Sequence, residues 1–286
     1  MIKRRDVLHS PKLQELKRNR RKNLQNKILL YVGSIIAIVV VLILISRIPK
    51  LNISIVNISG NKIIDTEKIN EVVLENLNGY YLYFIPKSNF LIYPKKKIIK
   101  DITEKYRRLT NINFSLSGAE TLDISVSERE GKYIWCGDIL SDLDLNPTDN
   151  TCSFLDNTGY AFDTSPYFSG NVYFKFFGKL TNNQFYPELW NKLVVLKEAL
   201  SDMNLRPASL YIKTDGDIEI YLVSNILPPD SPKIILKSVF ILDKTKENLQ
   251  AAVNTEPLLS DLKSKNKILE YIDLRFGNKV YYKFRP

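Results

Sequence analysis

The chain has 286 residues, enough for one large domain or two ordinary ones, and its 44% hydrophobic content is ample for a packed core. Its net charge of +10 is concentrated in residues 1–27, which carry ten Lys and Arg but only two acidic residues. The rest of the chain holds 31 basic and 29 acidic residues. A nucleic-acid-binding domain gathers positive charge on a folded face, so this distribution argues against nucleic acid as a partner.

An uncharged, apolar run from Ile28 to Ile45 follows the basic residues. A helix over this run is about 27 Å long, close to the thickness of a bilayer's hydrocarbon core. Residues 28–48 are therefore predicted to be a transmembrane helix. The positive-inside rule makes residues 1–27 a basic cytoplasmic tail and places everything after Arg47 outside the cytoplasmic membrane. A cleaved signal peptide is the alternative, but "SRIPKLN" is a poor cleavage site and a signal's apolar region is shorter.

Two cysteines, Cys136 and Cys152, lie on the predicted outer side, where disulfides persist. One ends a strand-like segment, the other begins one, and a polar segment connects them, so a disulfide is favoured over two buried thiols. The only histidine, His9, is in the tail, which excludes an outer Ser-His-Asp or Cys-His triad and a structural zinc site. Neither a Gly-rich phosphate loop nor a paired acidic site stands out. The sequence thus predicts no enzyme, no metal, no cofactor and no small-molecule substrate.

Residues 51–130 read as a first outer domain of order strand, helix, helix, strand, strand. The opening strand "NISIVNI" has Ile53, Ile55 and Ile58 as its apolar positions. A helix follows the turn Ser59-Gly60-Asn61, and its stripe has three- and four-residue spacing: Ile69, Val72, Val73 and Leu77. After a stretch of aromatic and proline residues, Pro94 begins a second helix, and "INFSL" and "TLDISVSER" are two strands.

Residues 131–286 read as a second, larger domain that consists mainly of strands. "CSFLDNTGYAF" predicts a hairpin across Asp156–Gly159, and one amphipathic helix is predicted over about 187–203. A second helical region over roughly 245–263 is broken near Pro257. The chain finishes on "YIDLRFGNKVYYKF", two strands joined by Gly277-Asn278. Strands with a few helices predict an α+β fold, with a mixed sheet that carries its helices on one face.

Four segments, in order along the chain, resemble the FtsQ/DivIB family of bacterial cell-division proteins. "ISIVNISGNKIIDTEKI" resembles the opening of a POTRA domain, and "TLDISVSERE" resembles its closing strand. "CSFLDNTGYAF" and "YIDLRF" resemble the family's hairpin and its C-terminal signature. The chain departs from the family pattern at Ala119-Glu120-Thr121-Leu122, at Gly131 and in its cysteine pair.

The resemblance implies a scaffold of the divisome, the assembly that builds the division septum. The POTRA-like domain would contribute to septal localisation, and the second domain would bind an FtsB/DivIC-type partner and, through it, an FtsL-like protein. The alternatives are a POTRA-containing chaperone or translocation accessory protein of the cell envelope and a membrane-anchored wall hydrolase.

A free sheet edge at the terminal hairpin is the expected docking site, because a partner strand adds to such an edge through main-chain hydrogen bonds. The predicted partner-binding residues are Phe276, Lys279, Val280, Tyr281, Tyr282, Lys283 and Phe284, with Phe276 and Tyr282 as an apolar platform. Asp273, Arg275, Gly277 and Asn278 are expected to shape the hairpin.

Overall fold

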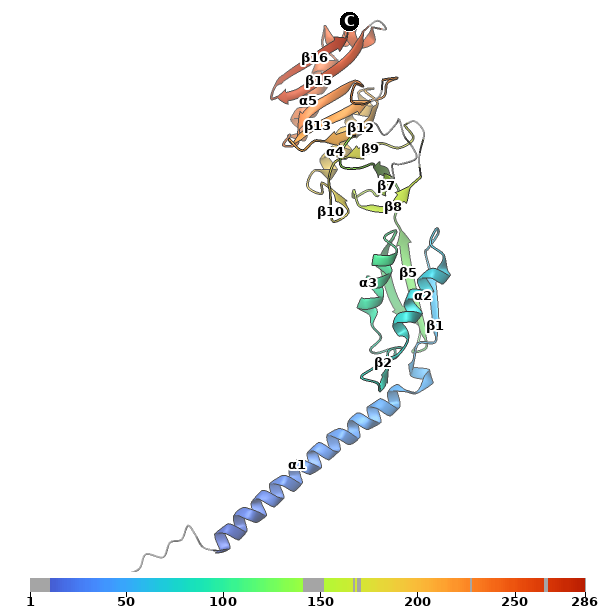
Figure 1. Cartoon of the computed structure of the whole chain (residues 1–286), viewed down its shortest axis with the longest axis vertical. Coiled ribbons are helices and arrows are strands. Elements are labelled where there is room, and N and C mark those ends of the chain that lie inside the picture. The colour runs from blue at the N-terminus through green and yellow to red at the C-terminus, as the bar shows by residue number, and fades with distance from the viewer. Residues whose placement is uncertain are drawn as a thin grey trace, which may run out of the picture. The chain divides into compact units, whose positions relative to one another are not determined.

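The computed structural model describes residues 11–140, 152–166, 168, 171–226, 228–264 and 267–285. The protein divides into two compact units, Met1–Glu128 and Arg129–Pro286. The division lies close to the boundary that the sequence predicts. The overall class is mixed α+β, with a long apolar N-terminal helix and a large sheet (Figure 1).

Helix α1 runs from Pro11 to Ser46 and is the one helix in the described residues that is long and apolar enough to cross a membrane. It begins well before the predicted span at residue 28. The basic segment that precedes the apolar run is rich in Lys, Arg, Leu and Gln, which are strong helix formers, so the helix continues through it. The predicted basic tail is therefore helical from Pro11 onward.

The remainder of the first unit is a three-stranded sheet covered by two helices. The elements are β1 (Ile55–Ser59), α2 (Thr66–Leu77), β2 (Tyr80–Tyr81), β3 (Ile85–Pro86), α3 (Lys95–Lys105), β4 (Leu109–Leu116) and β5 (Thr121–Glu128), after a short 3-10 helix over Pro49–Leu51. The strand order is β1-β5-β4, with β1 parallel and β4 antiparallel to β5. The predicted order of strands and helices is confirmed, and β2 and β3 form a small additional hairpin.

The predicted helical stripe is the core of this unit. Its residues are buried together with residues of α3 and β5: Ile69, Val72, Val73, Leu77, Ile98, Ile102, Leu122, Ile124 and Val126. One expectation for the first strand is wrong, because Ile55 is 51% exposed. Strand side chains alternate between the two faces, and Val56 and Ile58 occupy the face that packs on the core.

The second unit is built on a nine-stranded mixed sheet of order β16-β15-β14-β13-β12-β9-β6-β7-β8. Its strands are β6 (Tyr133–Trp135), β7 (Cys152–Leu155), β8 (Ala161–Ser165), β9 (Lys175–Phe177), β12 (Pro207–Ile212), β13 (Asp217–Leu222), β14 (Lys233–Lys237), β15 (Ile268–Phe276) and β16 (Lys279–Arg285). A separate small hairpin contains β10 (Leu180–Thr181) and β11 (Gln184–Phe185). The helices are α4 (Trp190–Asp202), α5 (Leu242–Val253) and α6 (Leu258–Lys263).

The described helices of this unit share one core with one face of the sheet. Ile220 pairs with Leu210 and Ile234, and Ile234 pairs with Ile272, so these four side chains point the same way. They form a single buried cluster with helix residues Leu193, Leu196, Leu200, Leu249, Val253 and Leu258. This agrees with the predicted helices on one face, and the break at Pro257 separates α5 from α6.

Cys136 and Cys152 are joined by a disulfide, the pairing that the sequence favours. The bond lies on the opposite face of the sheet, in a small cluster with Ile134, Phe177 and Phe154. The predicted connecting loop falls largely on residues 141–151, which lie outside the described residues.

We expect reduction of this disulfide to destabilise the second unit by about 3 kcal/mol, because the bond restricts the unfolded chain. A reductant should lower the denaturant midpoint of the native protein by the corresponding amount. The double variant with Cys136→Ala and Cys152→Ala should already have the lower midpoint and should not respond to reductant. A native midpoint that is unchanged by full reduction would contradict this expectation.

Candidate docking edge at the terminal hairpin

Strand β16 is an outer edge of the nine-stranded sheet (Figure 1). It pairs only with β15, antiparallel, with Tyr282 opposite Ile272 and Tyr281 opposite Asp273. In such a pair, alternate residues direct their N–H and C=O groups to the neighbour and the others direct them outward. Within the part of the chain that the structure describes, the outward groups of β16 face no further strand.

The side chains of β16 divide between the two faces of the sheet. Val280, Tyr282 and Phe284 are half-buried and pack against the main core. Lys279, Tyr281 and Lys283 are exposed on the other face. The strand is therefore held by its apolar side, while its backbone edge stays open. Lysine is a residue that proteins place on edges to discourage unspecific pairing. Lys279 and Lys283 have such positions on β16, and Lys283 forms an ion pair with Glu270 at 2.9 Å.

The turn of the hairpin is fixed by a glycine and by helix α5. Gly277 has a φ of +69°, a region that L-residues with a Cβ rarely adopt. Asn248 of α5 donates a hydrogen bond from Nδ2 to the carbonyl oxygen of Gly277, with a distance of 2.9 Å. The turn between β15 and β16 is thus held against α5.

The exposed apolar platform differs in one residue from the prediction. Phe276 packs edge-on against Tyr281, with ring centroids 5.1 Å apart, whereas Tyr282 points to the core face. The register between β15 and β16 shifts between Asp273 and Phe276. An irregularity of this kind changes the alternation of side chains, which brings Phe276 to the face of Tyr281.

Asp273 and Arg275 belong to an ion-pair network on the open face. Arg275 Nε lies 2.9 Å from Asp273 Oδ1, and its Nη2 lies 2.6 Å from Oδ2. Its Nη1 donates to Asp217 Oδ2 at 2.6 Å, and Lys237 Nζ lies 2.5 Å from Asp217 Oδ1. Both carboxylates are only 5% exposed. The network joins three strands, so the terminal hairpin is tied to β13 and β14.

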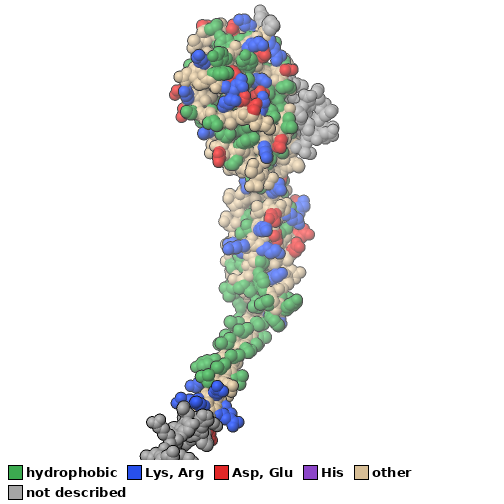
Figure 2. Space-filling model, turned by 60° about the vertical axis from the view of Figure 1, so that its left-hand side comes forward, with side chains coloured by type: hydrophobic (Ala, Val, Ile, Leu, Met, Phe, Trp, Pro, Cys, Tyr) green, Lys and Arg blue, Asp and Glu red, His purple; other side chains and the backbone are tan. Residues whose placement is uncertain are grey.

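A second polar group lies beside this network on β13, on β14 and at Lys213, directly after β12. The buried Glu219 accepts a hydrogen bond from the hydroxyl of Tyr221 and forms ion pairs with Lys213 and Lys233 at 3.4 and 3.2 Å. Figure 2 shows basic and acidic side chains intermixed on the visible face of the large domain. On the open face of the sheet, the acidic side chains of these two networks are therefore paired with basic ones.

The carboxyl of Asp217 has a pKa below its ordinary value, chiefly because Lys237 donates a hydrogen bond to it, and Arg275 adds to the effect. A lowered folded-state pKa means that the ionised carboxylate stabilises the fold above the unfolded value of about 3.8. This stabilisation is lost as the pH falls below 3.8 through the lower, folded-state pKa.

We therefore expect the Asp217→Asn variant to be less stable than the native protein at pH 7, with a difference that shrinks as the pH falls below 3.8. Denaturant unfolding at a series of pH values measures this difference. Asp215→Asn, in the exposed turn before β13, is the matched control and should change the pH profile little. A stability difference that does not depend on pH would contradict the assigned role of Asp217.

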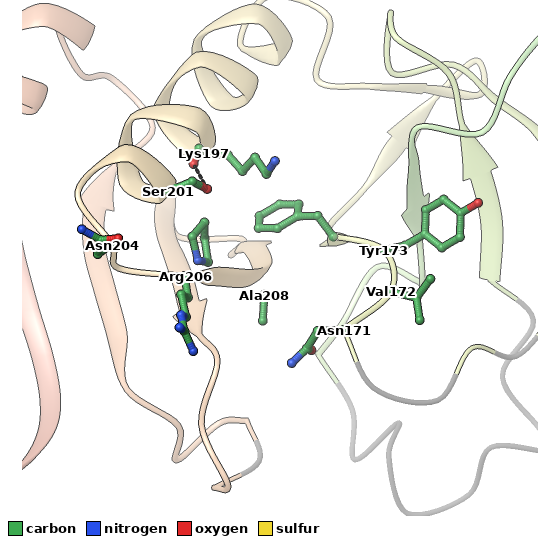
Figure 3. A pocket seen from close by; sticks show the side chains of 10 residues that line it. Asn171, Val172, Tyr173, Lys197, Ser201, Asn204, Arg206 and Ala208 are labelled. Carbon is green, nitrogen blue, oxygen red and sulfur yellow. Dashed lines mark hydrogen bonds between the residues drawn. The ribbon is translucent and has the colours of Figure 1, made fainter. Parts of the chain in front are cut away.

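A polar pocket of about 400 Å³ lies between α4, the start of β12 and residues 171–174. Figure 3 shows Lys197 and Ser201 of α4 on one side and Arg206 and Asn171 on others. The lining residues belong to elements other than β15 and β16, so the pocket is no part of the docking edge. Among the described residues, no three His, Cys, Asp or Glu side chains gather in a way that would hold a metal ion.

The structure brings the predicted residues Asp273, Arg275, Gly277 and Asn278 together in one hairpin and adds partners that the sequence did not indicate. Asp217 reads in the sequence as a turn residue, yet it is a strand residue and anchors Arg275. In "DIEIYL", Asp217, Glu219 and Tyr221 occupy alternate positions. This alternation is the signal that could have predicted that the three side chains share one face of a strand. Comparison of the chain with protein-family models and with curated proteins found no match in either.

Proposed function

We propose that this chain is a single-pass membrane protein of the bacterial divisome, which recruits and regulates proteins of septal wall synthesis through protein contacts. In this proposal α1 is the anchor and the basic end of the chain is cytoplasmic. The part of the first unit that follows Arg47 and the whole second unit lie outside the cytoplasmic membrane. The observation that carries the proposal is an edge strand, β16, which packs alternate side chains on the core while its backbone edge is open.

The docking mode that this edge supports is β-augmentation. A segment of an FtsB/DivIC-type partner adds as a tenth strand beside β16, and that partner brings an FtsL-like protein. Main-chain hydrogen bonds give affinity, while the Phe276–Tyr281 pair and the exposed Lys279 and Lys283 contact the partner's side chains. Because Lys283 is paired with Glu270, the exposed Lys279 is the residue that favours an acidic side chain on the partner segment.

The first unit has the strand, helix, helix, strand, strand order on which the POTRA resemblance depends, with one small added hairpin. This order supports the proposal that the unit contributes to septal localisation and upstream recruitment. A chaperone or translocation accessory protein is the second candidate, because an open sheet edge can also receive an extended, unfolded chain. A single such domain in the described residues favours the divisome role, because a chaperone or translocation component usually carries several. Lysines on the edge also discourage pairing with an arbitrary extended chain.

A fluorescent fusion of the full chain tests this proposal. Localisation as a band at midcell that disappears when other division proteins are depleted is the expected result. An even distribution over the cell envelope throughout the cell cycle would reject the divisome role. A cell-wall digestion assay with the purified protein addresses the hydrolase alternative, and release of wall fragments would overturn a purely scaffolding function.

A further inference from the structure

The hairpin of β2 and β3 presents large apolar side chains to the outside of the first unit. Tyr80 is 57% exposed, Leu82 82%, Tyr83 90% and Phe84 54%. Apolar side chains that gather on a surface in this way usually mark an interaction site. Leu82 and Tyr83 at the tip also have positive φ values of 47° and 66°, a conformation that is unfavourable for such residues. Leu82 and Tyr83 therefore expose their large side chains to the outside in a backbone conformation that costs free energy.

The hairpin is tied to the end of the apolar helix. Arg47, the first charged residue after the apolar run, donates from Nε to the carbonyl oxygen of Phe84 at 3.1 Å. Its guanidinium group also lies 5.9 Å from the centre of the Tyr80 ring. Asn52 donates from Nδ2 to the carbonyl oxygen of Ser46 at 3.0 Å. The contacts of Arg47 thus place the hairpin beside the end of α1, where the apolar run stops.

Further exposed apolar residues continue the surface between α1 and the hairpin. Ile48 is 44% exposed, Leu91 75% and Ile92 43%. Leu91 is held near the same helix end, because Asn89 accepts from the Leu91 N–H at 3.2 Å and bonds the carbonyl oxygen of Ser46 at 3.4 Å. In Figure 2 the hydrophobic side chains of α1 run into those of the adjoining part of this unit.

We propose that the β2–β3 hairpin, together with Leu91 and Ile92, inserts into the outer interface of the bilayer beside α1. This inference rests on the membrane anchoring in the proposed function and adds a second, peripheral contact. If α1 spans the membrane, Arg47 lies at the headgroups, and the hairpin bonded to it lies at the same depth. Tyrosines and an apolar tip at that depth match the aromatic belt of membrane proteins. Exposed Lys50 adds attraction to anionic headgroups. The occupant is therefore the lipid surface.

Such an insertion has a mechanical consequence for the first unit. The contacts of Ser46 and Arg47 tie the rest of the unit to α1, but a single helix can still tilt and rotate in the bilayer. The hairpin supplies a second point of attachment, so the β1-β5-β4 sheet is held in one orientation on the bilayer. The orientation limits where the unit can meet other membrane proteins.

Lipid quenching of tryptophan fluorescence tests the proposal on the full chain reconstituted in anionic vesicles. The natural tryptophans, Trp135 and Trp190, lie in the second unit and provide a constant background. Tyr83→Trp places a reporter at the hairpin tip without a loss of apolar character. Ile63→Trp is the matched control. Ile63 is also exposed, at 65%, but its backbone N–H donates to the carboxylate of Glu128, at the end of β5 that lies away from α1. Val39→Trp reports on α1 itself.

The expected result is that lipids brominated on their acyl chains remove most of the reporter emission of Tyr83→Trp, which is also blue-shifted, and leave that of Ile63→Trp unchanged. Quenching of Val39→Trp without quenching of Tyr83→Trp would overturn the hairpin inference while leaving the membrane anchor intact. If Val39→Trp were also unquenched, the membrane anchor of the proposed function would fail as well. Tyr83→Trp emission that shifts only when a second membrane protein is added would indicate a protein partner and would likewise overturn the lipid assignment.

Discussion

Replacement by proline of a β16 residue whose N–H points outward should lower the affinity for the partner at least about tenfold, because one main-chain hydrogen bond and the close approach of the partner strand are lost. The fold should stay intact, because that N–H makes no hydrogen bond to β15. Neighbouring residues of a strand direct their amides to opposite edges, so of Tyr281 and Tyr282 one amide bonds β15 and the other faces outward. The variants Tyr281→Pro and Tyr282→Pro therefore form a pair. One should lose stability through the β15–β16 ladder, and the other should lose binding.

Thermal unfolding identifies which variant keeps the fold, and titration of that variant with the extracytoplasmic segment of an FtsB/DivIC-type protein gives its affinity. Valine at the same position as that proline is the matched control, Tyr281→Val or Tyr282→Val, because it removes the ring but keeps the amide and suits a strand. The control should bind within a few fold of the native protein. Native affinity in the folded proline variant would show that the edge of β16 does not dock the partner.

Replacement of Arg275 by alanine should destabilise the second unit by about 3 kcal/mol, because it leaves Asp217 and Asp273 buried without their shared cation. Lys237 remains near Asp217, so the larger share of the penalty falls on Asp273. Denaturant unfolding followed by tryptophan emission measures the change. Lys279→Ala, a change at an exposed residue of the same hairpin, should stay within about 0.5 kcal/mol of the native value.

A double variant separates this mechanism from a simple loss of packing. If buried, unpaired charge is the cause, Arg275→Ala combined with Asp273→Asn should recover part of the stability that Arg275→Ala loses, because the amide carries no charge. Full additivity of the two losses, or an Arg275→Ala effect below about 1 kcal/mol, would contradict the network's role.

Local patterns in the sequence predicted the helices well. The uncharged run Ile28–Ile45 predicts an apolar helix by length, and the three- and four-residue spacing from Ile69 to Leu77 predicts the buried face of α2. These signals depend only on neighbouring residues. The first strand was assigned less well, because a run of isoleucines at both odd and even positions does not fix which face is buried, and Ile55 points outward.

The arrangement of strands in the sheet could be predicted only in part, because pairing depends on residues far apart in the chain. β14 and β15 pair in parallel across a connection that contains two helices, as parallel neighbours require a long crossover. β9 lies between β12 and β6, although it directly precedes neither of them in the strand order along the chain. Arg275 meets Asp217 from a strand that follows it by more than fifty residues, so neither residue alone indicates the pair. The contact of Phe276 with Tyr281 depends on a register shift that has no clear mark in the sequence.

The central claim is that a partner strand adds to the free edge of β16, and amide hydrogen exchange tests it most directly. Exchange should be followed along the whole second unit, with and without the extracytoplasmic segment of the FtsB/DivIC-type protein. The account predicts that the partner slows exchange of the outward amides in Lys279–Arg285 and leaves the opposite edge strand, β8, unchanged. Protection that appears on other elements while β16 exchanges at its free rate would contradict it.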